Sequence, residues 1–471
     1  MNRITHSAGR KLFGMTLNQV IAQKDNWEDG TDKLLALMKR YMKGEKIDFD
    51  YERASALLHD SSGVLHDYID RIIKETDENV LKTTALNLGY EAFFHGTKTI
   101  RKKRKELDCN VPWLILMDPT SACNLHCIGC WAAEYGHKLN LSYEELSDVI
   151  AQGKKLGIYF YMFTGGEPLV RKKDILRLCE EHNDCAFLSY TNGTLIDEAF
   201  CKEMQRVGNL YLALSLEGFE DVNDRRRGTG VYEKVLNAMD MLHEHGLVFG
   251  TSICYTSANI EAVTSDEFIH MLVDKGNRYA LYFHYMPVGN DAAVELLPTM
   301  EQRLYMKDRI RKIRSLEHGL GLFTMDFQND GEYVGGCIAG GRNYFHINAN
   351  GDAEPCVFIH FSGANIRTHS LVEILRQPLF MAYRDNQPFN ENHLRPCPML
   401  ENPEILERMV KESGAKSTDL QSPESAEHLC AKCHTYAGNW APIADSLWAK
   451  ETHKKPAYEN YKVRTESRQA V

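Results

Sequence analysis

The stretch SACNLHCIGCWAA (Ser121–Ala133) places three cysteines, Cys123, Cys127 and Cys130, within eight residues. A structural zinc site uses four closed ligands, which often come from Cys-x2-Cys pairs. His126 is adjacent to Cys127, which is an awkward position for a fourth ligand. Iron–sulfur clusters are bound by thiolates, and three thiolates on a four-iron cluster leave one iron open. The stretch therefore favours a cluster whose open iron can bind a further molecule.

The cysteine loop follows the first of six short apolar runs that alternate with amphipathic segments. One of those segments opens with Ser142 and Glu145 at the spacing of a helix capping box. Such alternation predicts an α/β fold with a parallel sheet and right-handed crossovers, as in a partial TIM-like (β/α)6 barrel. Chemistry in such barrels lies on the loops at the carboxyl ends of the strands. The six runs are 113–119, 157–166, 186–193, 210–218, 246–256 and 280–289.

The chain divides into four parts by pattern. Apolar residues at three- and four-residue spacing predict a helical N-terminal domain over residues 1–108. The barrel is expected at 109–328, a small cysteine-rich extension at 329–445 and a polar tail at 446–471. The basic run RKKRK (Arg101–Lys105) closes the first part. It is interpreted either as a solvated helix end or linker, or as a docking site for an anionic partner such as a phospholipid headgroup or an acidic peptide.

Composition narrows the class of protein. The 471 residues carry a net charge of −10, which disfavours a nucleic-acid-binding role. The sequence contains no apolar run of about 18 residues, and the N-terminus has no secretory h-region, so we expect a cytoplasmic protein without a membrane span. In that compartment thirteen cysteines favour metal or cluster ligation over a disulfide framework.

The motif CNLHCIGCW, with Trp131 after the third cysteine, resembles the signature loop of the radical S-adenosylmethionine (SAM) superfamily. Further motifs agree in order along residues 112 to 325: GGEP after the second run, TNG after the third, SLE after the fourth and an arginine before Gly228. The glycines of GGEP let the backbone approach a ligand closely, and an arginine suits bidentate carboxylate binding. The resemblance implies SAM contacts at Gly165, Gly166, Glu167, Pro168, Asn192, Ser215, Glu217, Arg227 and Met286.

The resemblance also implies a mechanism and its partners. A [4Fe-4S] cluster on the three cysteines binds SAM through its open iron, and one electron cleaves SAM reductively. The resulting 5′-deoxyadenosyl radical abstracts a hydrogen from the substrate. We therefore expect SAM and a reductant such as flavodoxin or ferredoxin as partners.

A second set of cysteines follows the barrel. The string CIAGGRNYFHINANGDAEPC resembles the start of a SPASM or twitch extension, and its NANGD turn predicts a hairpin. Five cysteines cannot fully ligate two four-iron clusters, so one auxiliary [4Fe-4S] cluster is expected, with a zinc site as the alternative. The expected ligands are Cys337, Cys356 and Cys397, with Cys433 or Cys430 as the fourth.

Three functions stay open at this point. The leading one is a radical SAM enzyme acting on an unidentified substrate, with a peptide or protein as one candidate class. The second is a radical SAM enzyme that acts on lipid acyl chains at a membrane surface, which the basic run would favour. The third, a non-catalytic iron–sulfur electron carrier, would need no SAM-binding motifs.

Overall fold

The computed structural model describes residues 3–41 and 50–450. Its centre is a sheet in the order β7-β6-β5-β4-β3-β2-β1-β8-β9, in which β1 to β7 pair in parallel and β8 pairs in parallel with the free side of β1. This confirms the predicted α/β fold with a parallel sheet. The strands are β1 (Leu114–Thr120), β2 (Phe160–Gly165), β3 (Ala186–Thr191), β4 (Leu210–Ser215), β5 (Phe249–Tyr255), β6 (Tyr279–His284), β7 (Phe323–Asp326), β8 (Tyr344–Ile347) and β9 (Ala353–Glu354).

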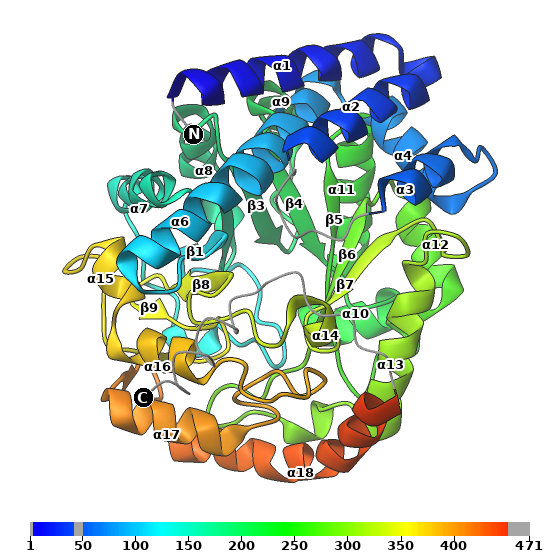
Figure 1. Cartoon of the computed structure of the whole chain (residues 1–471). Helices are drawn as coiled ribbons and strands as arrows, with labels where there is room; N and C mark the ends of the chain where they lie inside the picture. Colours follow the sequence, from blue (N-terminus) through cyan, green and yellow to red (C-terminus); the bar gives the residue numbers. More distant parts are fainter. Residues whose placement is uncertain (1–2, 42–49, 451–471) are drawn as a thin grey trace.

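Strands β1 to β6 correspond to the six predicted runs, while β7 and β8 extend the sheet beyond them. Each of these two added strands has only four residues, too few to show a periodicity in sequence. Helices between the strands cover one face of the sheet (Figure 1). They are α7 (Tyr143–Leu156), α8 (Lys172–Glu181), α9 (Glu198–Val207), α11 (Val231–Glu244), α12 (Asp266–Asp274) and α13 (Met300–Ile313). Helix α10 (Glu220–Arg227) lies instead beside the carboxyl ends of the strands. The predicted capping box of Ser142 and Glu145 starts α7.

The described part of residues 1–108 is helical, and it closes the amino-terminal end of the barrel. Three hydrogen bonds join it to loops that precede strands. They run from Tyr68 Oη to the Arg278 carbonyl (2.8 Å), from the Asp77 amide to the Gly246 carbonyl (2.9 Å) and from Asn87 Nδ2 to the Cys185 carbonyl (2.9 Å). The helices are α1 (Arg3–Ala22), α2 (Trp27–Tyr41), α3 (Tyr51–His59), α4 (Val64–Glu75), α5 (Glu78–Thr84), the π-helix η2 (Ala85–Gly96) and α6 (Thr97–Leu107).

Figure 1 shows α1 and α2 at one end of the molecule and the C-terminal helices α17 (Pro403–Ser413) and α18 (Ala426–Lys450) at the other. The predicted hairpin is present, since β9 runs antiparallel to β8 and Gly351 in its turn has a φ of 85°. Short helices α15 (Leu371–Leu375) and α16 (Pro378–Asn386) follow. Helix α18 continues to Lys450, beyond the predicted start of the tail at 446, and residues 451–471 lie outside the described part. The four domain boundaries stay a prediction.

The basic run lies on α6 and is partly engaged within the fold. Lys102 and Lys103 contact Glu106 at 3.4 and 2.8 Å, and Arg104 donates to the Val111 carbonyl. These contacts fit the interpretation of a solvated helix end. Among the described helices, none combines the length and the apolar character that crossing a bilayer would require.

Candidate functional site

The three-cysteine loop follows β1, at the carboxyl end of the sheet. Cys123, Cys127 and Cys130 are free thiols; the first two are half-buried and the third is exposed. Gly129, between the second and third thiols, has a φ of 67°, and a Cβ atom there would lie 3.1 Å from the Tyr285 ring. The loop is therefore bent at Gly129 and backed by the segment that follows β6.

The loop after β2 docks on the cysteine loop by backbone contacts. The Gly166 and Glu167 amides donate to the carbonyls of Thr120 (3.0 Å) and Ala122 (2.8 Å). A Cβ atom on Gly166 would lie 2.2 Å from the Ala122 carbonyl oxygen, so only glycine fits there. Gly165, at a φ of 106°, makes the turn into this contact. The GGEP glycines thus bring two backbone segments together beside the three thiols.

Glu167 points into the protein. The residue is only 1% exposed. Its carboxylate accepts hydrogen bonds from the Thr191 hydroxyl (2.7 Å), the Asn192 amide (2.7 Å) and the Leu169 amide (2.9 Å). Burial raises the pKa of this carboxyl. The side chain therefore links the loops after β2 and β3, and the buried Pro168 starts the turn η4 (Pro168–Arg171) beside it.

Asn192 joins the same assembly from β3. Its Nδ2 donates to Asn124 Oδ1 inside the cysteine loop (2.8 Å), and its Oδ1 accepts from the Thr194 hydroxyl (2.6 Å). Asn124 also donates to Thr194 (2.8 Å). Sequence reasoning did not single out Asn124 and Thr194, although Asn124 lies within the cysteine motif and Thr194 directly follows the TNG motif.

An ion-pair cluster lies beyond β4. Glu217, almost fully buried, is 2.5 Å from Arg227 Nη2 and 2.6 Å from Arg226 Nη1. Arg227 Nη1 also lies 3.9 Å from Cys127 Sγ. The Ile128 amide donates to the Arg226 carbonyl (3.0 Å), and Arg226 Nε donates to the Ile128 carbonyl (3.1 Å). The cluster therefore places positive charge against the cysteine loop. Arg226, one residue before the predicted contact residue Arg227, is therefore also paired with Glu217.

Two other predicted contact residues are less closely tied to this assembly. Ser215 is half-buried at the end of β4. Met286 is buried in the C-terminal hydrophobic cluster, while the neighbouring Tyr285 is the residue that reaches the cysteine loop.

The second set of cysteines gathers in that C-terminal cluster. Cys430 and Cys433 on α18 are fully buried there, and Cys337, Cys356 and Cys397 pack against it half-buried. Cys356 Sγ is 2.8 Å from the Tyr344 hydroxyl. Burial, the Glu401 carboxylate and the thiolates of Cys337 and Cys356 raise the pKa of the Cys397 thiol. Five thiols from three separate segments thus share one region.

A buried charged network links the two cysteine regions. His346 on β8 contacts Asp118 Oδ1 through Nε2 (2.9 Å) and Glu354 Oε2 through Nδ1 (2.7 Å), and all three side chains are fully buried. Burial opposes the charge on His346, but the two carboxylates raise its pKa to about 10. The Trp131 ring, next to Cys130, stands edge-on to His346 with ring centroids 5.7 Å apart.

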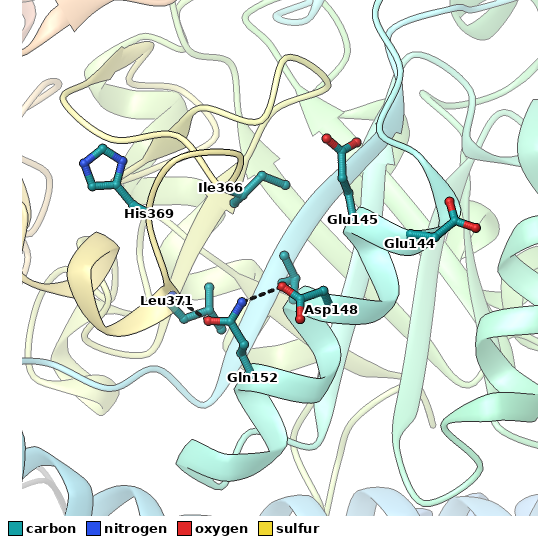
Figure 2. A pocket seen from close by; sticks show the side chains of 8 residues that line it. Glu144, Glu145, Asp148, Gln152, Ile366, His369 and Leu371 are labelled. Carbon is teal, nitrogen blue, oxygen red and sulfur yellow. Dashed lines mark hydrogen bonds between the residues drawn. The ribbon is translucent and has the colours of Figure 1, made fainter.

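Two hollows lie outside this assembly. A small cavity of about 240 Å³ lies between α7 and the segment 366–371. Figure 2 shows Glu144, Glu145 and Asp148 on its α7 side and His369 opposite. A larger groove of about 770 Å³ runs between residues 294–301 and α18. Tyr436 in its wall bonds to His284 at the end of β6 (2.8 Å), so the groove adjoins the carboxyl end of the barrel.

The residues present fit an iron–sulfur cluster with SAM. Three thiols, none in a disulfide, stand on one loop, which suits a cluster with one open iron. Because Gly166 has no side chain, its backbone can pack directly against the Ala122 backbone beside the three thiols. The guanidinium of Arg227, whose Nη1 lies near Cys127, places positive charge next to the thiolates.

Family models match the chain in two places. The model of the radical SAM superfamily matches residues 117–272, and that of the SPASM iron–sulfur cluster-binding domain matches residues 337–399. Residues 117–272 are thus a radical SAM domain, and residues 337–399 are a SPASM domain. A radical SAM domain implies a [4Fe-4S] cluster with SAM, and a SPASM domain implies auxiliary iron–sulfur clusters. Cys430 and Cys433 lie beyond the SPASM match.

Individual relatives are distant. An Fe-coproporphyrin III synthase from Methanosarcina barkeri is 27% identical over 47% of this chain and 57% of its own length, so this chain spans less than two thirds of that relative. The mycofactocin maturase MftC from Mycolicibacterium smegmatis is 26% identical over 55% of this chain and 69% of its own.

Among solved structures, Streptococcus suis SuiB, solved bound to its precursor peptide SuiA and bound to S-adenosylmethionine, shares the fold. The TM-score is 0.53 at 18% identity for both structures. Each match covers 72% of this chain. It covers 80% of the SuiB chain in the peptide-bound structure and 82% of the SuiB chain in the SAM-bound structure.

Proposed function

We propose that this chain is a radical SAM enzyme that removes a hydrogen atom from a peptide or protein substrate. The observation that carries the proposal is the three-thiol loop at the carboxyl end of β1, against which the GGEP loop packs backbone to backbone. Cys123, Cys127 and Cys130 would hold the cluster. When bound, the cluster and SAM supply the 5′-deoxyadenosyl radical that abstracts the hydrogen.

The chain's own residues position that chemistry. Glu167 fixes the loops after β2 and β3 and so holds Gly165 and Gly166, two of the predicted SAM contacts, against the cysteine loop. Glu217 holds Arg227 beside Cys127, where the guanidinium can pair with the SAM carboxylate. Asn192 and Ser215 complete the predicted SAM contacts from β3 and β4. Tyr285, whose ring lies against Gly129, shields that side of the loop from water.

The second set of thiols would hold one auxiliary cluster. Cys337, Cys356 and Cys397 are the proposed ligands, with Cys433 or Cys430 as the fourth. Both candidates lie buried on α18 in the hydrophobic cluster against which the other three thiols pack. Zinc stays the alternative occupant, and iron and sulfide analysis of the Cys337→Ala, Cys356→Ala double variant separates the two.

Two observations support a peptide as the substrate class. SuiB, which shares this fold, was solved with a precursor peptide, and the maturase MftC is a sequence relative. The groove of about 770 Å³ beside the end of β6 is large enough for several side chains. No comparison supports the lipid or the electron-carrier alternative. The proposal places the protein in the cytoplasm, where thiols stay reduced and a flavodoxin or ferredoxin can supply the electron.

The test measures 5′-deoxyadenosine formed by the reconstituted, reduced protein with SAM, with and without fractions of a cell extract. Stimulation by the peptide fraction that is lost after protease treatment is expected. Stimulation by lipid vesicles alone would contradict the substrate class while leaving the radical SAM activity intact. The variant Cys127→Ala should form no product, and Cys201→Ala, which removes a buried thiol on α9 that belongs to none of the motifs, should retain activity.

A further inference from the structure

Three potential metal ligands converge at the amino-terminal end of the barrel, away from both cysteine regions. His6 on α1 and Glu91 and His95 on η2 each offer one ligand atom, and these atoms all lie within 4.8 Å of one another. Glu91 is buried, with its side chain 2% exposed. Two imidazoles and one carboxylate form a donor set that zinc and other divalent transition metals bind in proteins.

The Glu91 carboxylate is oriented for one ligand role. Its Oε2 lies 2.9 Å from His6 Nε2, while its Oε1 accepts from Arg10 Nη1 at 2.7 Å. Arg10 also donates to Asn87 Oδ1, and Asn87 is anchored to the carbonyl of Cys185 before β3. Carboxylates that bind metals are commonly held by such an outer hydrogen bond on their second oxygen. Arg10 therefore leaves Oε2 free to face the two histidines.

His6 and Glu91 form an ion pair with each other, but the ion pairs of Glu91 do not include His95. Its ring makes no hydrogen bond within residues 3–41 and 50–450, although it stacks on His6 with ring centroids 3.9 Å apart. A ring nitrogen of His95 is thus available as a metal ligand.

The backbone under the cluster is also unusual. Glu91 and His95 lie on η2, a π-helix of 12 residues, whereas most π-helical segments in proteins are single turns and often mark functional sites. The Tyr90 hydroxyl donates to the His6 carbonyl at 3.0 Å and fixes α1 above this helix. The position of His6 relative to the two η2 residues is thus set by contacts outside the cluster.

We propose that His6, Glu91 and His95 bind one divalent transition-metal ion of the zinc class. The ion would replace the proton in the hydrogen bond between His6 Nε2 and Glu91 Oε2, and that proton would pass to solvent. A water molecule would complete the coordination of the ion. The site would fix α1 to η2, which closes the barrel where its strands begin, so its role is structural and independent of the radical chemistry.

The test uses the full chain without a histidine tag, with its iron–sulfur clusters reconstituted so that the cysteines are occupied. After incubation with one equivalent of zinc and desalting, zinc is counted, and its K-edge X-ray absorption spectrum is recorded. The proposal predicts one bound zinc with nitrogen and oxygen scatterers at about 2.0 to 2.2 Å. It also predicts a zinc-dependent rise in the melting temperature.

The variants His95→Gln and His6→Gln should lose most of the bound zinc and the thermal shift. His66→Gln is the matched control, since His66 also faces a glutamate, Glu28, in the helical region but lies outside the cluster. Circular dichroism and iron content establish that each variant is folded. Absence of stoichiometric zinc in the wild type, sulfur scatterers around it, or equal zinc in His95→Gln would each overturn the proposal.

Discussion

Replacing His346 by phenylalanine tests whether the buried charged network holds the two cysteine regions together. The substitution keeps an aromatic ring but removes both donors, which leaves Asp118 and Glu354 buried without their cation. A rise in pKa from 6.5 to about 10 corresponds to about 5 kcal/mol, since one pKa unit is about 1.36 kcal/mol. Breaking a buried ion pair typically costs about 3 to 5 kcal/mol. We expect a loss in that range.

Hydrogen exchange of peptides that cover β1 and β8 is the appropriate assay, because it reports local opening without assuming that the whole chain unfolds in one step. The expected loss corresponds to opening that is on the order of a hundred-fold to several thousand-fold more frequent. The exposed His369 provides the control His369→Phe, which should exchange as the wild type does. A change of less than about tenfold in His346→Phe would refute the reasoning.

The pH dependence has a definite sign. The folded pKa of His346 lies above its unfolded value, so its ion pairs stabilise the fold fully below about pH 6.5 and are lost as the pH approaches 10. The difference between wild type and His346→Phe should therefore shrink as the pH rises through this window. A difference that grows with pH would contradict the assignment of His346 as the buried cation.

Three further substitutions follow from the site. Gly166→Ala places a methyl group against the Ala122 carbonyl. SAM binding, measured by equilibrium dialysis, should therefore weaken at least about tenfold while the iron content stays unchanged. An unchanged affinity for SAM would contradict the backbone docking. Glu217→Gln removes the charge that holds Arg227, and the Kd for SAM should rise by about tenfold; a rise equalled by Glu220→Gln, an acidic neighbour on α10, would contradict a specific role. Cys397→Ala should lower the iron and sulfide content by one cluster, while the electron paramagnetic resonance signal that responds to SAM persists. An unchanged iron content would exclude Cys397 as a ligand.

Sequence reasoning reached the parallel sheet and the cysteine loop because both depend on local patterns. The apolar runs of β1 to β6 and the spacing of Cys123, Cys127 and Cys130 are visible within short windows. The hairpin at Gly351 was predictable for the same reason, since its turn residues are adjacent in sequence.

The features that were missed depend on contacts between distant segments. His346 and Asp118 are 228 positions apart, and His6 and Glu91 are 85 apart. No local pattern marks a buried histidine as the partner of a carboxylate on another strand. Likewise, Glu167 belongs to a motif that suggested ligand contact, yet its side chain turns inward to Thr191 and Asn192, which only the packing of three loops determines.

The central claim is that the loop of Cys123, Cys127 and Cys130 supports reductive cleavage of SAM. The most direct measurement is 5′-deoxyadenosine formation by anaerobically reconstituted, reduced protein, compared with the triple variant in which these cysteines are alanine and with the double variant Cys337→Ala, Cys356→Ala. The account predicts product from the wild type and none from the triple variant, with SAM cleavage retained when the auxiliary pair is removed. Product formed by the triple variant at the wild-type rate would contradict it.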